Sequence, residues 1–593
     1  MTSTALRAVA AATPRPRAPH WVPALGAAGG VLAALSALLV VGFLVDGLRA
    51  GDLDWGRLLT SSTWNPPTGD FGVTAMLWGT LAVSGVALLL AVPVGWAAAI
   101  ALHEHVPPGL ARPLRTGVEL LAAVPSIVYG LVGIAAVRPF VSRLGDVPGG
   151  DSLLAAGLVL AVMVLPTVVA VSVDALAAVP AAVREAAASL GLTRSEVVRS
   201  AVLPLARPGM RAGVLLGLAR ALGETIAVFL VIGRADGRLP DPASALRSML
   251  EPGQSLTTKL GGPEPVLAGA VGPHRAALCA VGLLLLLAVA AATVAGASGR
   301  RGRPSGVRRG RALPARELRC AARRSVRLGA VALPLALLTG VAVLLLDRGS
   351  VALDPAFWTS ASTGASGGGV RDQILGTVLL VAAAGVLALP VGLGLGLVLG
   401  EYASPRTVRA LRTATLTLGG VPTILLGLAG YAVFSTALGW GKSWLAGAIV
   451  LAIVVVPVVA LTTAARLDSL APERREAALA LGLSRSQLIR SVLLPHARPA
   501  VLTGLLLGLA RAAGETAPLL FTATVFAGAP SLPSGVVQQP VQALPSHVFT
   551  LAQDAADPAS IANAWGAALV LVVLAGLLLL AAVPARRRLE RTS

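Results

Sequence analysis

Two arginine–glutamate pairs stand inside long apolar stretches of the sequence, where charge is otherwise rare. Arg220 and Glu224 lie within "GLARALGETIAV", and Arg511 and Glu515 hold the same places in "GLARAAGETAPLL". A charge at the centre of a bilayer costs about 2.5–3.5 kcal/mol even on lenient insertion scales, so such residues usually face a cavity or a partner. The i,i+4 spacing places each pair on one helical face, where the two charges can neutralise each other. Alternatively, the two guanidinium groups line a shared pathway and bind a tetrahedral oxyanion in bidentate fashion.

A second pattern is polar and occurs twice between apolar stretches. The string "EAAASLGLTRSEVVRSAVLP" recurs without a gap as "EAALALGLSRSQLIRSVLLP". The first copy predicts two short helices separated by Gly191, the second one capped by Thr193 or Ser195 and ended before Pro204. The second copy has the same signals, at Gly482, Ser484 or Ser486, and Pro495. Because a shorter loop would serve to join two helices, the repetition of this hairpin indicates a binding surface.

The overall composition is that of a membrane protein. Of the 593 residues 55% are hydrophobic and only 13% are charged, against about 25% charged in ordinary soluble domains. The formal charge of +20 would suit nucleic acid, but the arginines gather in the tails, the middle linker and the short loops. That distribution is typical of cytoplasmic loops of membrane proteins. Two isolated cysteines and six scattered histidines predict neither a disulfide nor a metal site.

Apolar runs long enough to span a bilayer predict an all-α polytopic protein with about twelve spanning helices. They lie near 22–46, 74–101, 114–137, 152–173, 210–232 and 275–298, and near 327–346, 373–400, 413–437, 443–464, 500–526 and 563–584. The first run is too long for a cleaved signal peptide and is expected to be retained. The segment 299–327 holds eleven arginines and one acidic residue, so it is expected in the cytoplasm. Both termini are then cytoplasmic, and the loops at 47–73, 233–273, 347–372 and 527–562 lie outside.

The two halves of the chain are repeats of each other. Matches from Pro166 onward keep an offset of 291 residues, whereas "VPSIVYGL" with "VPTILLGL", the "GT" at Gly79 and Glu104 match at an offset of 297. Polar residues, Gly and Pro at fixed spacing set these matches apart from chance identity between apolar helices. The predicted organisation is a tail (1–21), a first permease domain (22–298), a basic linker (299–326), a second permease domain (327–585) and a tail (586–593). Pro125 and Pro422 are expected to kink the third and ninth spans.

The repeated polar loop resembles the EAA loop of ABC importer permeases, with its Glu-Ala-Ala triplet, a Gly six residues after the Glu, and an apolar-x-Leu-Pro ending. The matching residues are Glu185, Ala186, Ala187, Gly191, Leu203 and Pro204 in the first half, and Glu476, Ala477, Ala478, Gly482, Leu494 and Pro495 in the second. The resemblance implies two type I importer transmembrane domains of six helices each. It also implies that 183–204 and 474–495 form coupling helices that dock on an ATPase.

The apolar motifs are further similar to PstC and PstA, the paired permease subunits of phosphate-specific ABC importers. "GLARALGETIAV" with "VPSIVYGL" resembles the first subunit, and "GETAPLLFTA" with "VPTILLGL" resembles the second, over roughly 74–298 and 373–584. Those subunits are usually separate chains, whereas a basic linker joins them here. The resemblance implies that Arg220 and Arg511 contact phosphate in transit, while Glu224 and Glu515 orient the arginines and keep them from holding the anion too tightly.

The partners implied by the resemblance are a homodimeric PstB-like ATPase, with one subunit under each half, and an extracytoplasmic PstS-like phosphate-binding protein. The chain has no Gly-x-x-x-x-Gly-Lys-Ser/Thr phosphate loop, so no enzymatic activity and no bound cofactor are expected, and ATP and Mg²⁺ belong to the partner. The expected location is the cytoplasmic membrane. Two alternatives remain open: an ABC permease for another solute such as sulfate or molybdate, and an ion-coupled secondary transporter, which would have no reason to repeat a docking loop.

Overall fold

The computed structural model describes residues 40–49, 51–241, 244–268, 272–299, 317–402, 404–553 and 557–591. Regular structure within them is helical, apart from the antiparallel pair β1 (Trp64–Asn65) and β2 (Asp70–Phe71) and three isolated bridges. The long helices of the first half are α4 (Thr74–Glu104), α5 (Pro108–Ala123), α8 (Leu153–Ala177), α11 (Leu203–Gly223) and α16 (Pro273–Gly299). Those of the second half are α17 (Glu317–Arg348), α19 (Arg371–Leu397), α20 (Pro405–Gly420), α22 (Trp444–Asp468), α25 (Leu494–Ala513) and α28 (Pro558–Arg591). The all-α polytopic prediction is confirmed.

Nine helices within the described residues are long and apolar enough to cross a membrane, or ten if one bent pair counts as a single span. With the bent pair counted as one span, two of the twelve predicted spans are not among these ten. The first lies outside the described residues except for helical residues 40–49. The fifth, α11, carries Arg207, Arg211 and Arg220, whereas its counterpart α25 carries two arginines. The predicted tail at 1–21 and most of the linker, 300–316, also lie outside the described residues.

The third and ninth spans are broken, which is a larger distortion than the predicted kink. The helix α6 (Ser126–Val132) begins directly after Pro125, and α21 (Thr423–Gly430) begins directly after Pro422. In the second half the helices on either side of this break meet at 90°. The residue before a proline disfavours helical backbone, and Val124 and Val421 are accordingly extended. Each proline therefore ends one helix and opens the next.

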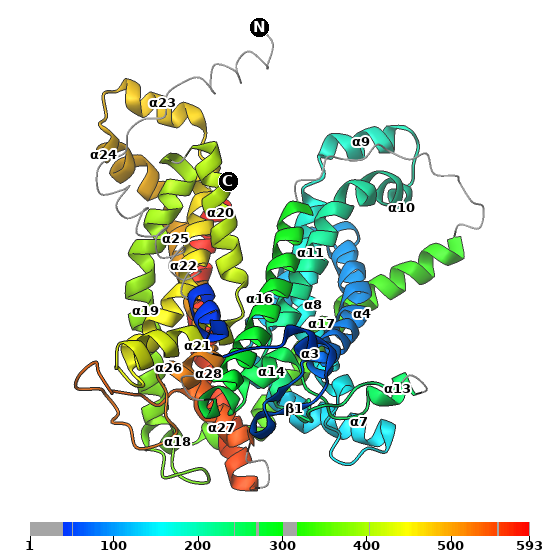
Figure 1. The fold of residues 1–593 in the computed structure, drawn as a ribbon. Helices are drawn as coiled ribbons and strands as arrows, with labels where there is room; N and C mark the ends of the chain where they lie inside the picture. The colour runs from blue at the N-terminus through cyan, green and yellow to red at the C-terminus, as the bar shows by residue number, and fades with distance from the viewer. Residues whose placement is uncertain are drawn as a thin grey trace.

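The two halves form two columns of helices that converge at one end and stand apart at the other (Figure 1). The separated ends carry the short helices α9 (Ala181–Ser189) with α10 (Arg194–Val197), and α23 (Pro472–Ala480) with α24 (Arg485–Leu488). The opposite end carries α3 (Trp55–Thr60), β1, α7 (Arg138–Gly145), α13 (Ala245–Ser248), α18 (Pro355–Thr359) and α27 (Leu544–Gln553). Both repeated loops thus lie on one side of the molecule, as parallel repeats require.

Some helices of one repeat pack against the column formed by the other repeat. The helix α17, which opens the second half, packs against α4 and α5 of the first half. Leu44, in the described part of the first span, packs at Gly282 of α16, where Leu425 of the second half also packs. The first span of each repeat therefore contributes to contacts with the other repeat.

The repeated Gly-Thr pair contacts the start of a short helix at the converging end of each half. Thr80 Oγ1 accepts a hydrogen bond from the Leu256 N–H at 3.0 Å, at the start of α14 (Leu256–Gly261). In the second half Thr377 Oγ1 accepts from the Leu544 N–H at 2.9 Å, at the start of α27. A Cβ on Gly79 would lie 2.0 Å from the Gln254 carbonyl oxygen, so only glycine permits this approach. The equivalent distance at Gly376, to the Gln542 carbonyl oxygen, is 1.9 Å.

We therefore expect Gly79→Ala to destabilise the protein by about 1–3 kcal/mol, because the added methyl group must displace backbone. The measurement is the apparent Tm of the purified chain in detergent. Gly85→Ala on the same helix is the matched control, since a Cβ there meets nothing within 4 Å. An equal Tm for the two variants would contradict this account of the Gly-Thr pair.

Candidate functional site

The helices that carry the intramembrane arginines end just after them. The helix α11 ends at Gly223, and Glu224 has extended backbone (φ −74°, ψ 128°) before α12 (Ile226–Phe229) begins. In the second half α25 ends at Ala513, and α26 (Ala517–Thr522) begins three residues after Gly514. The prediction that each Arg and Glu share one face of a continuous helix is therefore wrong, because each Glu lies beyond the helix end.

The breaks pack crosswise between the halves. A Cβ on Gly514 would lie 3.0 Å from Pro125 Cβ, and a Cβ on Gly223 would lie 3.8 Å from Pro422. Each Gly-Glu-Thr motif thus contacts the Val-Pro motif of the other repeat. The two repeated motifs that the sequence analysis singled out separately form one interface, which places both arginine–glutamate pairs near the centre of the molecule.

The first pair makes its hydrogen bonds to other partners. Arg220 donates to Thr167 Oγ1 at 3.2 Å. Glu224 accepts hydrogen bonds from the Ala227 N–H and the Ser126 hydroxyl, although it also attracts Arg220 electrostatically. The second pair is closed, with Arg511 Nε 3.5 Å from Glu515 Oε1. The side chain of Arg511 is 50% exposed, whereas that of Glu515 is 17% exposed.

The charges of the two pairs act on each other across the interface. Arg220 is attracted by Glu224 and Glu515 and repelled by Arg511. Coulomb energies are large where water is excluded, so an anion that enters this cluster meets two cations, and the two carboxylates compete with it. The self-neutralising interpretation describes the second pair as it stands, but it does not explain why the first pair is open or why Arg511 is half exposed.

The repeated loops form helical hairpins with the predicted caps. Thr193 and Ser484 are the N-cap residues, and each makes a capping box, with Glu196 and Gln487 respectively. The second helix does not end before Pro204, as the sequence predicted, because a π-helical turn (Val198–Val202) carries it directly into α11. A proline inside a helix lacks a backbone N–H and crowds the preceding turn. The wider π-turn stands directly before Leu203 and Pro204, and the helix continues through the proline there.

The exposed surface of each hairpin is nearly the same in the two halves. Glu185, Ala186, Glu476 and Ala477 are exposed, Ala187 and Ala478 are buried, Leu203, Pro204 and Leu494 are partly buried, and Pro495 is exposed. Gly191 and Gly482 have φ of +75° and +77°, a conformation that suits glycine at a tight turn. Sequence reasoning missed Leu190 and Leu481, which are 80% and 81% exposed at the tips of the hairpins. Their equivalent positions in the repeat were the available signal.

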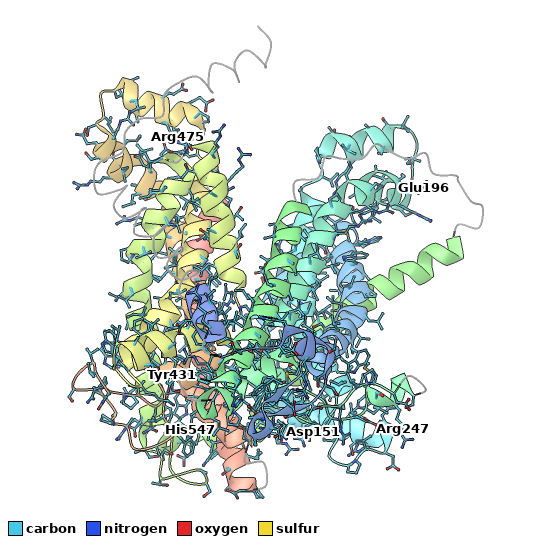
Figure 2. All side chains as sticks on the ribbon, viewed as in Figure 1. Asp151, Glu196, Arg247, Tyr431, Arg475 and His547 are labelled. Carbon is cyan, nitrogen blue, oxygen red and sulfur yellow. The ribbon has the colours of Figure 1, made fainter. Side chains whose placement is uncertain are left out.

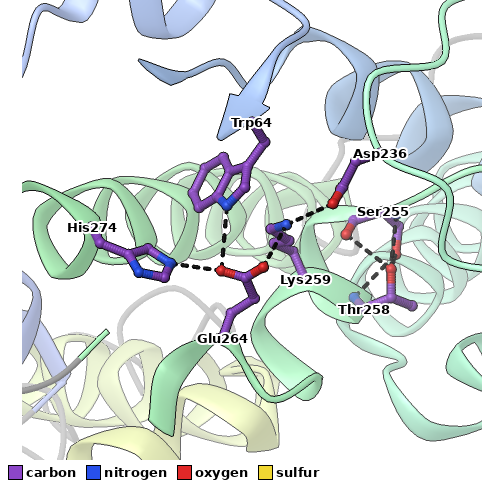
Figure 3. A network of polar contacts seen from close by, with 7 residues as sticks. All are labelled: Trp64, Asp236, Ser255, Thr258, Lys259, Glu264 and His274. Atoms are coloured by element: carbon purple, nitrogen blue, oxygen red, sulfur yellow. Dashed lines mark hydrogen bonds and ion pairs between the residues drawn. The ribbon is translucent and has the colours of Figure 1, made fainter. Parts of the chain in front are cut away.

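The opposite end of the molecule carries a network of ion pairs and hydrogen bonds that connects the segment 233–273 with Trp64 and His274 (Figure 3). Lys259 is 1% exposed, and its Nζ lies 3.0 Å from both Asp236 Oδ2 and Glu264 Oε1. Glu264 also accepts from His274 Nε2 at 2.6 Å and from Trp64 Nε1 at 3.3 Å. Figure 2 shows that the labelled residues Asp151, Arg247 and His547 lie at this end, whereas Glu196 and Arg475 lie at the end with the hairpins. The network links Trp64, which lies 200 residues before Glu264 in sequence, to the segment 236–274, and we interpret its role as structural.

The stability of this network is expected to depend on pH through Glu264. Burial raises the pKa of Glu264, but the hydrogen bonds and charge of Lys259, with the bonds from His274 and Trp64, outweigh burial and hold the pKa below its usual range. The stabilisation is therefore complete above the ordinary glutamate pKa of about 4.3 and is lost as the pH falls toward the lower native value. We expect pepsin to cleave within 233–273 increasingly below that pH, as measured by mass spectrometry.

Glu264→Gln is the control for this titration, because its amide has no proton to gain. Cleavage is corrected for the pH dependence of pepsin on an unfolded peptide. If the variant and the native chain then show the same pH profile, Glu264 does not control the stability of this segment.

The paired hairpins, the parallel repeats and the charges within apolar helices define a polytopic membrane permease. The chain belongs to the binding-protein-dependent transport system inner membrane component family, whose model matches residues 91–298 and again 392–591. It is 39% identical over 229 residues to the phosphate transport system permease protein PstC of Mesorhizobium japonicum, a match that covers 34% of this chain and 69% of the relative.

Two further relatives agree with this assignment. The phosphate transport system permease protein PstC of Haemophilus influenzae is 35% identical over 276 residues, which cover 43% of this chain and 83% of the relative. The probable ABC transporter permease protein YqgH of Bacillus subtilis is 40% identical over 193 residues, which cover 32% of this chain and 61% of the relative. Each match covers less than half of this chain, as expected if one relative corresponds to one repeat.

Proposed function

We propose that the chain is the membrane-spanning permease component of an ATP-driven importer of inorganic phosphate, with a PstC-like half followed by a PstA-like half. The observation that carries this proposal is the central cluster of Arg220, Glu224, Arg511 and Glu515 between two copies of one fold. Guanidinium groups bind tetrahedral oxyanions in bidentate fashion, and two relatives are named as phosphate transport permeases. In this proposal Glu224 and Glu515 compete with phosphate for the arginines, which keeps the anion from binding too tightly to leave.

The hairpins would dock the energy source. In this proposal a homodimeric PstB-like ATPase, which binds ATP and Mg²⁺, places one subunit on each hairpin, 183–204 and 474–495. Two separated but equivalent hairpins at one end of the molecule match a partner with twofold symmetry. A PstS-like phosphate-binding protein would deliver its ligand to the opposite end, where the halves converge. The hairpins, and with them both termini, would then lie in the cytoplasm, and the chain in the cytoplasmic membrane.

An aromatic contact at the end opposite the hairpins supports an inward-facing arrangement in this proposal. At the end opposite the hairpins, Phe229 of the first half contacts Phe549 of the second, with ring centroids 5.4 Å apart. Along α11 the chain runs from the hairpin through Arg220 to the break and then to Phe229. The arginines therefore lie on the hairpin side of this aromatic contact, from which phosphate would leave toward the cytoplasm.

The experiment that tests the proposal is an ATPase assay in liposomes that contain the chain, the ATPase and the binding protein. We expect phosphate to stimulate ATP hydrolysis, whereas sulfate and molybdate at the same concentration do not. If only sulfate or molybdate stimulates ATP hydrolysis, the substrate of the permease is that oxyanion and not phosphate. Phosphate uptake driven by an ion gradient without ATP would place it among secondary transporters.

A further inference from the structure

The docking helices have few apolar contacts with the spans that they would move. Only Ala187 is buried in α9 and only Ala478 in α23, among the described side chains of those helices. Within the described residues α9 packs mainly against α10 and the π-turn Val198–Val202, and α23 packs mainly against α24. Each hairpin is continuous in sequence with the spans on either side of it, α8 and α11 in the first half and α22 and α25 in the second. The spans α4 and α19 are not joined to a hairpin in this way, so a force on them needs another connection.

A buried ion pair supplies that connection in the first half. Arg184 of α9 donates from Nη1 to Glu104 Oε1 at 2.6 Å. Glu104 is the last residue of α4 and is 5% exposed. The second amino group of Arg184 donates to the Leu176 carbonyl oxygen at 2.9 Å, near the end of α8. Charge-assisted bonds of this length are strong, and a cation at a helix C-terminus is favoured by the helix dipole.

The second half repeats the arrangement. Arg475 of α23 lies 3.0 Å from Glu401, in the π-helical turn Val398–Tyr402 that continues α19, and donates to the Leu467 carbonyl oxygen at 2.7 Å, near the end of α22. Both glutamates are placed by the repeat at an offset of 297, whereas both arginines follow the offset of 291. The pairing therefore joins the two differently spaced parts of the repeat. Exposed ion pairs contribute little to stability, but these two glutamates are largely buried, with 6% and 13% of the side chain exposed.

We propose that Arg184–Glu104 and Arg475–Glu401 transmit the movement of the docking helices α9 and α23 to the spans α4 and α19. This inference rests on the proposed docking of an ATPase. Each arginine is a positioning residue that holds the end of one span and the end of its neighbour to the docking helix. Without the carboxylate the docking helix keeps its carbonyl contacts and its docking surface, but it no longer moves α4 or α19 with it.

The test compares movement on the two sides of the link. Spin labels on Ser189→Cys and Ala480→Cys report the distance between the docking helices. Labels on Leu89→Cys and Val386→Cys, which are 73% and 74% exposed at equivalent positions, report the distance between α4 and α19. The background chain has Cys279 and Cys320 replaced by alanine. Distances are measured by pulsed electron paramagnetic resonance on the complex with the ATPase, with and without ATP and vanadate.

In the native background we expect both distances to change when ATP and vanadate are added. In the variant with Glu104→Gln and Glu401→Gln we expect the α9–α23 distance to change as before, while the α4–α19 distance changes by less than half as much. The matched control is Glu473→Gln, which removes an exposed carboxylate from α23 without touching the link. In liposomes the variant should transport about tenfold less solute per ATP hydrolysed.

Several outcomes overturn the inference. An α4–α19 distance that changes equally in the variant and the native background shows that the link does not transmit movement. Loss of the ATPase from the purified variant shows that the pairs support docking instead. If neither distance changes in the native background, the proposed docking itself is wrong. The distance measurements do not depend on the substrate, so a failure of the phosphate assignment leaves them valid.

Discussion

Replacing both intramembrane arginines, Arg220→Ala with Arg511→Ala, is expected to lower phosphate uptake by about 100-fold or more. A hydrogen bond to a charged group contributes about 1.5–3 kcal/mol, and two such contacts would be lost from the anion. Glu224 and Glu515 would also stay behind without their cations and repel phosphate. Uptake of labelled phosphate by the reconstituted complex measures the effect. The matched control is Arg211→Ala with Arg498→Ala, which removes two exposed arginines from the same helices, α11 and α25.

A fourfold variant separates the two interpretations of these charges. Leucine at positions 220, 224, 511 and 515 removes both pairs at once, and replacing an ion pair with apolar residues is often neutral for stability. If the charges only neutralise each other, the fourfold variant transports phosphate normally. If the arginines contact the anion, the variant folds and binds the ATPase but does not transport. Normal transport by this variant would refute the proposed anion contacts.

The second large effect is expected at the tips of the hairpins. Leu190→Asp with Leu481→Asp should weaken binding of the ATPase by about 30-fold or more, because a buried apolar anchor at an interface contributes about 2 kcal/mol or more and a buried unpaired carboxylate adds a penalty. Co-purification of the ATPase with the tagged chain measures the loss. Leu353→Asp, at a leucine that is 69% exposed at the opposite end, is the control.

The single substitutions make this prediction sharper. Because the hairpins are separate and equivalent, either Leu190→Asp or Leu481→Asp alone should leave one docking site intact and give an intermediate affinity. Full binding by the double variant would show that these leucines are not part of the docking surface.

The parts of the fold that follow from local pattern were predictable. Apolar runs indicated the spans. Thr193 and Ser484 were recognisable as cap candidates, beside Ser195 and Ser486, because each stands two residues after the glycine that ends the first short helix, and the structure selects Thr193 and Ser484. The break after Gly223 was not predictable, since "GLARALGET" reads as uninterrupted helix and the break is held by packing against Pro422 and by hydrogen bonds that Glu224 accepts. A proline rule also failed at Pro204, where a π-turn gives the residue a tolerated position.

The candidate site shows the same division. The repeat identified Arg220, Arg511 and the Gly-Thr pairs as unusual, because polar residues and glycine matched at a fixed offset. It could not show what Gly79 and Thr80 contact, since Leu256 is 176 residues away in sequence. Likewise the match between Glu104 and Glu401 was visible, but their arginine partners follow a different offset. Contacts that join distant segments were missed because no local period encodes them.

The crosswise packing of Gly223 on Pro422 and Gly514 on Pro125 bears on assembly. Each repeat covers part of the other repeat's packing surface, and α17 of the second half packs against α4 and α5 of the first. A half produced alone would expose these faces and could pair with a second copy of itself, which would put two identical halves above the ATPase. Tethering raises the effective concentration of the correct partner to the millimolar range for short linkers. A single continuous chain therefore favours pairing of one first half with one second half in every complex, whatever the expression level of the protein.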